Sequence, residues 1–468
     1  MRFELSVTLL RDWADAVRTD SLRAIREARP RLERVTDPQL APWAALALSR
    51  LSQIEHVPSI PGALERGMSH ARDEALRGRL LLELAMHETD LERATALAEG
   101  VVGCADPDVA TLARLRVARI TQRRGDLARA RVMLDELRAR GKRSDRIGAG
   151  LDVVDALQEA SEGRISVALD RFESAFRWAV GNRADTDASE VAGLMGNTLH
   201  ALGDLERAIH WYAFAVRHAR RSGATSPAAI FEMYRGWAHH ESGDRAAAAR
   251  SYKRALPDLE ELRFRLHAEG LRALFARGPK RHAEVMRVAS ELERRHDHAR
   301  ARALSTLALS ADAREAAEVS SRPAAALTLL RLHGALAFDA TSDDERIALR
   351  MARAELARAV ARAARARAHL RVAVDGSAFV AGKRRVSLEK YPVLARVLVA
   401  LVRGSLEERP ITTDELVAAG WPNDRIRADA ARHRVQVAIS TLRVKGVPVV
   451  RAPAGYAIST SVGLLAKN

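Results

Sequence analysis

The chain has 468 residues and a formal net charge of +16, and 47% of its residues are hydrophobic, 29% charged and 4% aromatic. This length allows two or three domains, and the composition excludes a disordered chain and a membrane protein. Abundant Ala, Leu and Arg with few aromatic residues favour packed helices and exclude an all-β fold, so we expect a mainly α protein.

A pattern of one glycine and three apolar residues recurs in the first 340 residues. In each unit the glycine is followed at offsets of 5, 9 and 12 by residues on one face of a predicted helix. Small residues at offsets 5 and 12 allow a neighbouring helix to come close, and the larger residue at offset 9 fills the gap between helix pairs. The units are Gly125, Ala130, Leu134, Leu137; Gly163, Ala168, Phe172, Ala175; Gly203, Ala208, Tyr212, Ala215; and Gly243, Ala248, Tyr252, Ala255.

This pattern resembles the tetratricopeptide repeat (TPR), with spacings of 38, 40 and 40 residues that predict helices longer than in the usual unit of about 34. Gly196 and Gly236 predict a second close approach in the preceding helices. Further helix pairs are expected at 41–73, around Leu91, Ala94 and Ala98, at 259–296 and at 300–336. We therefore expect a TPR-like α-solenoid of seven or eight pairs over residues 1–340. Its concave surface is expected to bind a protein, peptide or small-molecule effector, and a spacer or dimerisation scaffold is the alternative.

The positive charge is concentrated in the last part of the chain. Residues 346–368 contain seven arginines against Glu355, and residues 369–468 contain 16 basic and 8 acidic side chains. A basic terminal module on a nearly neutral body suits a polyanionic partner. We expect residues 341–368 to form a basic connecting helix. Arg346, Arg350 and Arg353 share one face of it, which either follows DNA or is solvated.

The last hundred residues change from a helical to a mixed pattern. Alternating residues predict short strands over 370–388, followed by helices at 389–403, from Thr412 to Trp421, and at 428–445. Glu415 three residues after Thr412 predicts a capping box. Val435, Ile439 and Leu442 form the expected core stripe of the third helix. Residues 448–451 and 455–458 predict a closing hairpin.

This order of elements is that of a winged helix, and several motifs resemble the effector domain of OmpR/PhoB-type response regulators. The motifs are Val386-Ser387-Leu388, Glu415-Leu416, Trp421, the segment 435–443 and Gly455-Tyr456. The resemblance implies that residues 369–468 form a winged helix-turn-helix DNA-binding domain. Its third helix would enter the major groove, and its hairpin wing would enter the minor groove.

The face of the third helix beside its core stripe is expected to read DNA. Arg434 suits guanine, and apolar groups beside it suit thymine methyl groups. Flanking cations suit phosphates, and the resemblance implies a wing arginine in the minor groove. The expected base-proximal residues are Arg434, Val437, Ala438 and Thr441, the backbone-contacting residues are Arg432, His433, Arg443 and Lys445, and the wing residue is Arg451.

Together these features predict a cytoplasmic transcription regulator whose repeats sense an effector and whose last domain binds double-stranded DNA. The alternative is a TPR adaptor whose winged helix contacts proteins. We expect no enzyme activity, cofactor, metal or membrane association, because motifs such as a P-loop or His-Glu-x-x-His are absent, Cys104 is the single cysteine and no long apolar run occurs. Homodimerisation is a hypothesis based on the usual pair of DNA half-sites.

Overall fold

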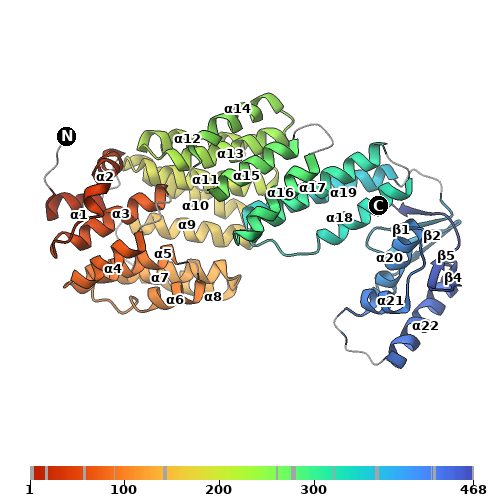
Figure 1. The fold of residues 1–468 in the computed structure, drawn as a ribbon. Helices are drawn as coiled ribbons and strands as arrows, with labels where there is room; N and C mark the ends of the chain where they lie inside the picture. Colours follow the sequence, from red (N-terminus) through yellow and green to blue (C-terminus); the bar gives the residue numbers. More distant parts are fainter. Residues whose placement is uncertain are drawn as a thin grey trace. The chain divides into compact units, whose positions relative to one another are not determined.

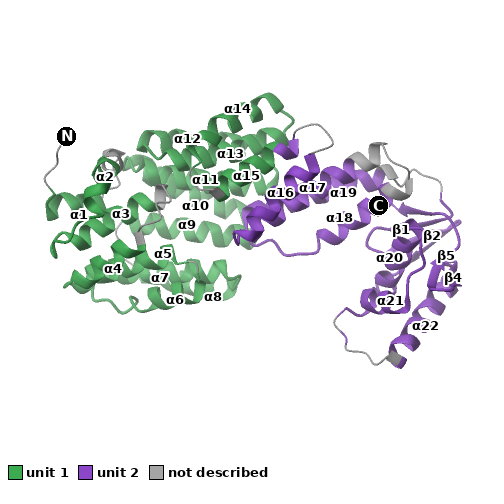
Figure 2. Cartoon of the chain, viewed as in Figure 1, with its two compact units in different colours: residues 1–272 green, residues 273–468 purple. Residues whose placement is uncertain are grey.

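The structure is a computed structural model, and it describes residues 5–15, 19–55, 60–88, 90–140, 145–259, 262–275, 281–319, 322–363, 368–422, 424 and 428–465. The chain forms two compact units, residues 1–272 and 273–468, which Figure 2 colours separately. Unit 1 is entirely helical in its described residues, and unit 2 contains helices and small sheets. The expected boundaries at residues 340 and 368 stay predictions.

Unit 1 consists of consecutive helix pairs (Figure 1). Its helices are α1 (Val7–Asp15), α2 (Thr19–Leu32), α3 (Ala41–Glu55), α4 (Ile60–His70), α5 (Glu74–His87), α6 (Leu91–Glu99), α7 (Pro107–Arg123), α8 (Leu127–Ala139), α9 (Asp145–Ser161), α10 (Ile165–Gly181), α11 (Asp185–Leu202), α12 (Leu205–Ser222), α13 (Thr225–Glu241), α14 (Arg245–Ala255) and most of α15 (Leu262–Phe275), whose last three residues belong to unit 2. A short 3-10 helix, Leu256–Asp258, follows α14.

The repeat pattern forms the interior between the paired helices, as the sequence predicts. All twelve apolar residues of the four units are at most 2% exposed. The four glycines lie between α7 and α8, α9 and α10, α11 and α12, and α13 and α14, with φ between +80° and +91°. Glycine adopts this left-handed conformation without the strain that a side chain would impose. After three of these glycines, an aspartate caps the next helix, and Asp244 for example accepts a 2.9 Å hydrogen bond from the Ala247 backbone NH.

The predicted close approach at Gly196 is confirmed. A Cβ atom at this position would lie 2.6 Å from the ring of Tyr212 in α12, closer than packed atoms allow. At Gly236 the corresponding distance to the Tyr252 ring is 3.1 Å. The sequence pattern did not identify Gly193, although a Cβ there would lie 2.0 Å from the ring of Phe231. Glycine therefore admits an aromatic ring from a neighbouring helix at three positions along α11 and α13, from the same pair at Gly196 and Gly236 and from the next pair at Gly193.

Unit 2 begins with further helices of the same kind, α16 (Arg281–Arg294), α17 (His298–Val319), α18 (Arg322–Ala335) and α19 (Asp343–Ala363). Within the described ranges, eighteen helices, α1 to α18, precede α19, and in unit 2 α17 packs against both α16 and α18. Helix α19 packs against α17 and α18 and buries Ile347, Ala352 and Leu356. The segment expected to connect two domains is thus largely a packed helix with one apolar face.

The last hundred residues have the predicted order of elements. Strands β1 (Leu370–Ala373), β2 (Ala378–Ala381) and β3 (Arg384–Ser387) precede helices α20 (Pro392–Leu406), α21 (Thr413–Gly420) and α22 (Ala428–Val444), and β4 (Val449–Ala452) and β5 (Gly455–Ile458) form an antiparallel hairpin. The predicted Thr412–Glu415 capping box is present. The sequence did not predict β6 (Val462–Leu465), which pairs parallel with β1 in a sheet of order β3-β2-β1-β6.

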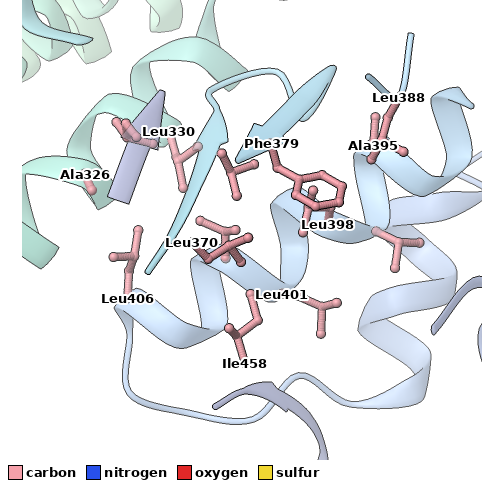
Figure 3. Close-up of a cluster of buried hydrophobic side chains, with 14 of the residues drawn as sticks. Ala326, Leu330, Leu370, Phe379, Leu388, Ala395, Leu398, Leu401, Leu406 and Ile458 are labelled. Atoms are coloured by element: carbon pink, nitrogen blue, oxygen red, sulfur yellow. The ribbon is translucent and has the colours of Figure 1, made fainter. Parts of the chain in front are cut away.

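One apolar core joins the end of the helical repeats to this mixed segment. Figure 3 shows Ala326 and Leu330 of α18 in the same cluster as Leu370, Leu406 and residues of α20. Helix α18 contacts α20 and β6, and α19 contacts β6. Burial of apolar surface is the main stabilising contribution to such an interface. The C-terminal sheet therefore shares its core with the helices that precede it.

Candidate binding sites

Unit 1 contains a cavity of about 780 Å³, which we call the repeat cavity. Its lining residues come mainly from the first helices of successive pairs, α3, α5, α7, α9, α11 and α13. In stacked helix pairs, the helices of one row line one continuous surface. The lining residues are Arg50, Ser52, Pro61, Ala85, Met86, His87, Ala94, Arg116, Arg119, Ile120, Arg123, Arg146, Thr186, Asp187, Ser189, Glu190, Ala224, Pro227, Ile230, Phe231 and Arg263.

Contacts between early and late helices of unit 1 close the stack around this cavity. Helix α2 contacts α12, and α3 contacts α13. The Arg26 guanidinium donates a 2.6 Å hydrogen bond to the carbonyl oxygen of Gly223, which ends α12. These helices are separated by more than a hundred residues in the sequence. The lining is therefore assembled from both ends of unit 1.

The cavity wall is rich in arginine. Six arginines and two carboxylates lie in the lining. Arg116, Arg119 and Arg123 follow one another along α7 at i, i+3 and i+7, which places them on one face of that helix. Sequence reasoning did not single out these residues, although their spacing was visible. The spacing predicts that the three arginines share one face of the helix, but it does not indicate whether that face lines a cavity or is exposed to solvent.

The three α7 arginines differ in whether they form ion pairs within the chain. Arg119 Nη2 lies 3.9 Å from a carboxylate oxygen of Glu190 on α11. Arg116 and Arg123 have no hydrogen bond or ion pair with any residue in the described ranges. Burial, followed by repulsion from Arg119, lowers the pKa of Arg116 to about 10. An anion entering the cavity would relieve this unfavourable electrostatic environment.

Another part of the lining combines two carboxylates with apolar groups. Asp187 and Glu190 lie on α11, and Ile230 and Phe231 lie on α13. The Phe231 ring packs over Gly193, so the close approach of α11 and α13 also positions an apolar part of the lining. The cavity thus offers cationic, anionic and apolar groups to one ligand.

A second candidate surface is the exposed face of α22. Arg434 and Val437 are exposed, with 52% of Val437 accessible, and Thr441 is half-buried. The Thr441 hydroxyl donates a 2.8 Å hydrogen bond to the Val437 carbonyl oxygen. Arg434 donates a 2.9 Å hydrogen bond to Asp424 and lies 6.0 Å from the centroid of the Trp421 ring. The structure therefore gives Arg434, the residue expected to contact guanine, an acidic partner within the chain.

Ala438 does not lie on this exposed face. It is 4% exposed and belongs to the same apolar cluster as Val435 and Ile439. The core stripe of α22 is wider than the predicted i, i+4, i+7 line, because the small side chain next to the stripe also turns inward. The structure thus places Ala438 in the core of α22, and its expected contact with a base stays a prediction.

The residues expected to contact the DNA backbone surround α22, with several held by contacts within the chain. Arg432 forms an ion pair with Asp429, and His433 is exposed. Arg443 Nε donates a 2.8 Å hydrogen bond to the Val449 carbonyl oxygen, which links α22 to β4. Lys445 Nζ lies 4.4 Å from the centroid of the Tyr391 ring, and Arg451 lies 5.6 Å from that of Tyr456. Arg443 thus has a structural contact in addition to its charge.

The basic residues of α19 lie beside its packed face. Arg346 is exposed and pairs with Asp343 at 2.8 Å, Arg353 is exposed and Arg350 is half-buried. Arg365 and Arg367, the last two arginines of the predicted connecting helix, fall outside the described residues. The ion pair of Arg346 and the partial burial of Arg350 are features of an ordinary helix surface. They fit the alternative of a solvated face at least as well as a face that contacts DNA phosphates.

The described residues contain no cluster of three or more His, Cys, Asp or Glu side chains placed to hold a metal ion. Within the same ranges, no helix has the length and apolar character needed to cross a membrane.

The fold defines a TPR-like helical-repeat protein. Neither a protein-family model nor a curated protein matches the sequence. The structure is similar to that of a Rap protein complexed with competence and sporulation factor, with a TM-score of 0.52 and 14% identity over 70% of this chain and 96% of that chain. It is also similar to aspartyl phosphate phosphatase F from Bacillus subtilis, with a TM-score of 0.47 and 13% identity over 72% and 96% of the two chains. At such low identities, the similarity establishes the helical-repeat fold alone.

Proposed function

We propose that the helical repeats are a receptor for a peptide or a flexible segment of a partner protein, which binds in the repeat cavity. The observation that carries this proposal is the cavity of about 780 Å³ lined by successive first helices. A Rap protein of similar fold was solved with competence and sporulation factor bound, which supports a ligand-binding role for this type of repeat body. The proposed role is binding, without a catalytic step.

The shape and chemistry of the cavity suit an extended segment. Its volume lies within the range of about 300–1,000 Å³ that is typical of ligand pockets. Met86, Ile230 and Phe231 provide apolar contact area, while the charged residues provide orientation. An extended segment exposes its own backbone groups, and polar residues from several helices are available to pair with them.

Selection of short displayed peptides on the full chain tests this proposal. Thr186→Trp adds a large side chain to a half-buried cavity position, and Thr111→Trp adds the same bulk to α7 outside the lining. We expect selected peptides to bind the parent protein and the Thr111→Trp variant, and to lose affinity for the Thr186→Trp variant. Peptides that bind both variants equally well would place their site elsewhere and contradict the proposal.

We propose as a second function that residues 369–468 form an OmpR/PhoB-type winged helix-turn-helix domain that binds double-stranded DNA. The observation that favours this is the exposed face of α22, with Arg434, Val437 and Thr441, directly before the β4–β5 hairpin that contains Arg451. Arginine donates well to guanine, and a hairpin arginine suits a narrow minor groove. Binding in the repeat cavity would then regulate DNA binding, which makes the protein a transcription regulator.

A salt series on genomic DNA fragments tests the second function. If several phosphates are neutralised, affinity should fall steeply between roughly 50 and 200 mM salt, with a log–log slope of about −0.9 per contact. Arg434→Ala should weaken or broaden binding, whereas Arg207→Ala on α12, a half-exposed arginine in unit 1, should leave it unchanged. Absence of salt-dependent DNA binding would favour the adaptor alternative, in which this domain contacts proteins.

A further inference from the structure

We propose that the repeat cavity selects peptides with acidic side chains and that Arg116, Arg119 and Arg123 of α7 form the row that recognises them. This inference rests on the proposed function, because it names the chemistry of the ligand that the repeat cavity would bind. We refer to these three residues as the α7 arginine row. All three line the repeat cavity.

The length of the row fits several successive carboxylates. Positions i and i+7 of a helix are separated by about 10 Å along its axis, because the rise is about 1.5 Å per residue. An extended peptide advances about 3.3 Å per residue, so the row matches about three residues of such a chain. A single phosphate group is too short to reach all three guanidinium groups at once. The row therefore suits a chain with repeated negative charges.

Two members of the row are available for a ligand. Arg116 and Arg123 have no hydrogen bond or ion pair with a described residue, and Arg116 is half-buried. Desolvation and repulsion from Arg119 lower the pKa of Arg116 to about 10, and attraction to Glu83 and Glu190 offsets only part of this destabilisation of the charged form. A ligand carboxylate would supply the remaining compensation through charge-assisted hydrogen bonds to the planar guanidinium.

The third member has a weak partner that a ligand could replace. Arg119 and Glu190 are 3.9 Å apart, and their side chains are 36% and 57% exposed. At this distance and exposure the ion pair contributes little stability. Glu190 also repels an acidic ligand. Its neutralisation should therefore strengthen binding of an acidic peptide, which is the opposite sign from neutralising the row.

Other anionic ligands fit the cavity less well. The cavity of about 780 Å³ has the volume of a ligand pocket, which is too small to hold a nucleic-acid duplex. The apolar residues Ile230 and Phe231 give a peptide side-chain contacts that a small dicarboxylate would not use. A peptide that alternates acidic and apolar side chains satisfies both parts of the lining.

The test uses the full chain and three pools of labelled peptides of about eight residues, which is longer than the segment of about three extended residues that matches the row. The pools have random apolar residues at alternate positions and Glu, Gln or Lys at the others. We expect the Glu pool to bind with a dissociation constant at least about tenfold lower than the Gln pool, since one charge-assisted hydrogen bond is enough for that factor. The Lys pool should bind most weakly.

Matched variants connect this preference to the row. Arg116→Gln combined with Arg123→Gln should remove most of the preference for the Glu pool. Arg129→Gln, an exposed arginine on α8 outside the lining, should keep it. Glu190→Gln should increase affinity for the Glu pool a few-fold, whereas the exposed Glu136→Gln, with the same change in net charge, should not. Arg123→Gln alone changes an exposed side chain, so it tests the row even if the double variant folds poorly.

The outcomes separate the two proposals. If the Gln or Lys pool binds as well as the Glu pool, the acidic preference is wrong while the receptor function stands. If no pool binds and no peptide is selected by display, both fail. Succinate and unlabelled Glu-pool peptide are compared as competitors of the labelled peptide. If succinate displaces the labelled peptide at as low a concentration as the unlabelled peptide does, the row binds a small anion, and the inference is overturned. If Arg129→Gln loses as much of the preference for the Glu pool as the Arg116→Gln, Arg123→Gln variant does, the preference comes from non-specific attraction by net charge, and the inference is overturned.

Discussion

The helical repeats and the C-terminal segment differ in how they place buried core residues relative to candidate binding residues. In unit 1, the apolar residues of the repeat pattern lie in the second helices α8, α10, α12 and α14 and are buried, while the arginines of the repeat cavity lie on other helices, α3, α7, α9 and α15. In the C-terminal domain, α22 alone holds both a core stripe and the candidate DNA-facing residues. On α22 a core residue directly follows an exposed one, because Val437 is 52% exposed and Ala438 is 4% exposed. Binding residues should therefore be easier to change in the repeats than on α22.

The largest expected effect is at the core shared by α18 and the C-terminal sheet. Leu330 is 3% exposed and lies in the same cluster as Leu370 and Leu406. Leu330→Ala should cost about 2–5 kcal/mol, because it leaves a cavity in a core that joins two elements. Native-state hydrogen exchange should show lower protection in α18 and in β1 and β6 together.

Leu202→Ala on α11, where the leucine is 48% exposed, is the control and should change the stability of the protein little. If Leu330→Ala loosens α18 while β1 and β6 keep their protection, the two elements do not form one cooperative core. A C-terminal fragment starting at residue 369 would then be as stable as one starting at residue 298.

In the helical repeats, the effect of a Gly→Ala substitution on stability should depend on the space around the added Cβ atom. Gly196→Ala places a Cβ 2.6 Å from the Tyr212 ring and should destabilise the protein by about 1–3 kcal/mol. Gly236→Ala, at 3.1 Å from Tyr252, should cost less. Gly148→Ala, in α9 with no atom within 4 Å, should stabilise by roughly 0.5–1 kcal/mol. Urea denaturation followed by helical circular dichroism measures all three, and an equal effect of all three would refute the close-approach argument.

The stability of the repeat body should decrease at acidic pH through His240 on α13. Burial, followed by repulsion from Arg245, lowers the pKa of His240 from 6.5 to about 4. The folded protein therefore binds fewer protons than the unfolded chain in this range, so stability is fully present above pH 6.5 and decreases as the pH falls to about 4. Because the ring is only half-buried, solvent screening reduces the full value of the shift, and the expected loss attributable to this residue is about 1–2 kcal/mol.

His240→Gln should flatten the fall in stability between pH 6.5 and 4, measured by urea denaturation at several pH values. His210→Gln replaces an exposed histidine on α12 and should keep the pH dependence of the parent protein. An unchanged profile in His240→Gln would assign the acid sensitivity to other groups.

The smallest expected effect concerns helix caps, where the two regions should behave alike. Thr412→Ala removes both halves of the capping box of α21, and Asp204→Ala removes the cap of α12. Each should cost about 1 kcal/mol. Thr441→Val, which removes a hydroxyl bonded within α22, serves as a comparison away from a helix end. A much larger loss for Thr412→Ala would mean that α21 has little stability beyond its cap.

Much of the fold could be predicted because its signals are local. The offsets of 5, 9 and 12 after Gly125, Gly163, Gly203 and Gly243 describe one helix face, and each such face is buried. Likewise, Thr412 and Glu415 are close in sequence and form the predicted cap. The parallel pairing of β6 with β1 was not predictable from the local pattern, because it joins strands about 90 residues apart and Val462–Leu465 carries no turn or alternation signal of its own.

The candidate sites were predictable only in part. The position of Arg434 and Val437 on an exposed helix face followed from helical spacing, but the burial of Ala438 and the Arg434–Asp424 contact depend on how α22 packs. The repeat cavity needed the structure, because Arg50, Arg116 and Arg263 come from helices far apart in sequence. Arginines are frequent throughout this chain, and their identity alone does not indicate which of them face one another.

Hydrogen exchange of the full chain with and without a display-selected peptide tests the central claim most directly. If the repeat cavity is the receptor site, bound peptide should slow exchange in α7, α11 and α13, whose residues form its walls. The Thr111→Trp variant, changed at a half-buried position outside the lining, should give the same footprint. Protection confined to α22 and the β4–β5 hairpin, or unchanged exchange throughout the lining helices under saturating peptide, would contradict the claim that the repeats bind the ligand.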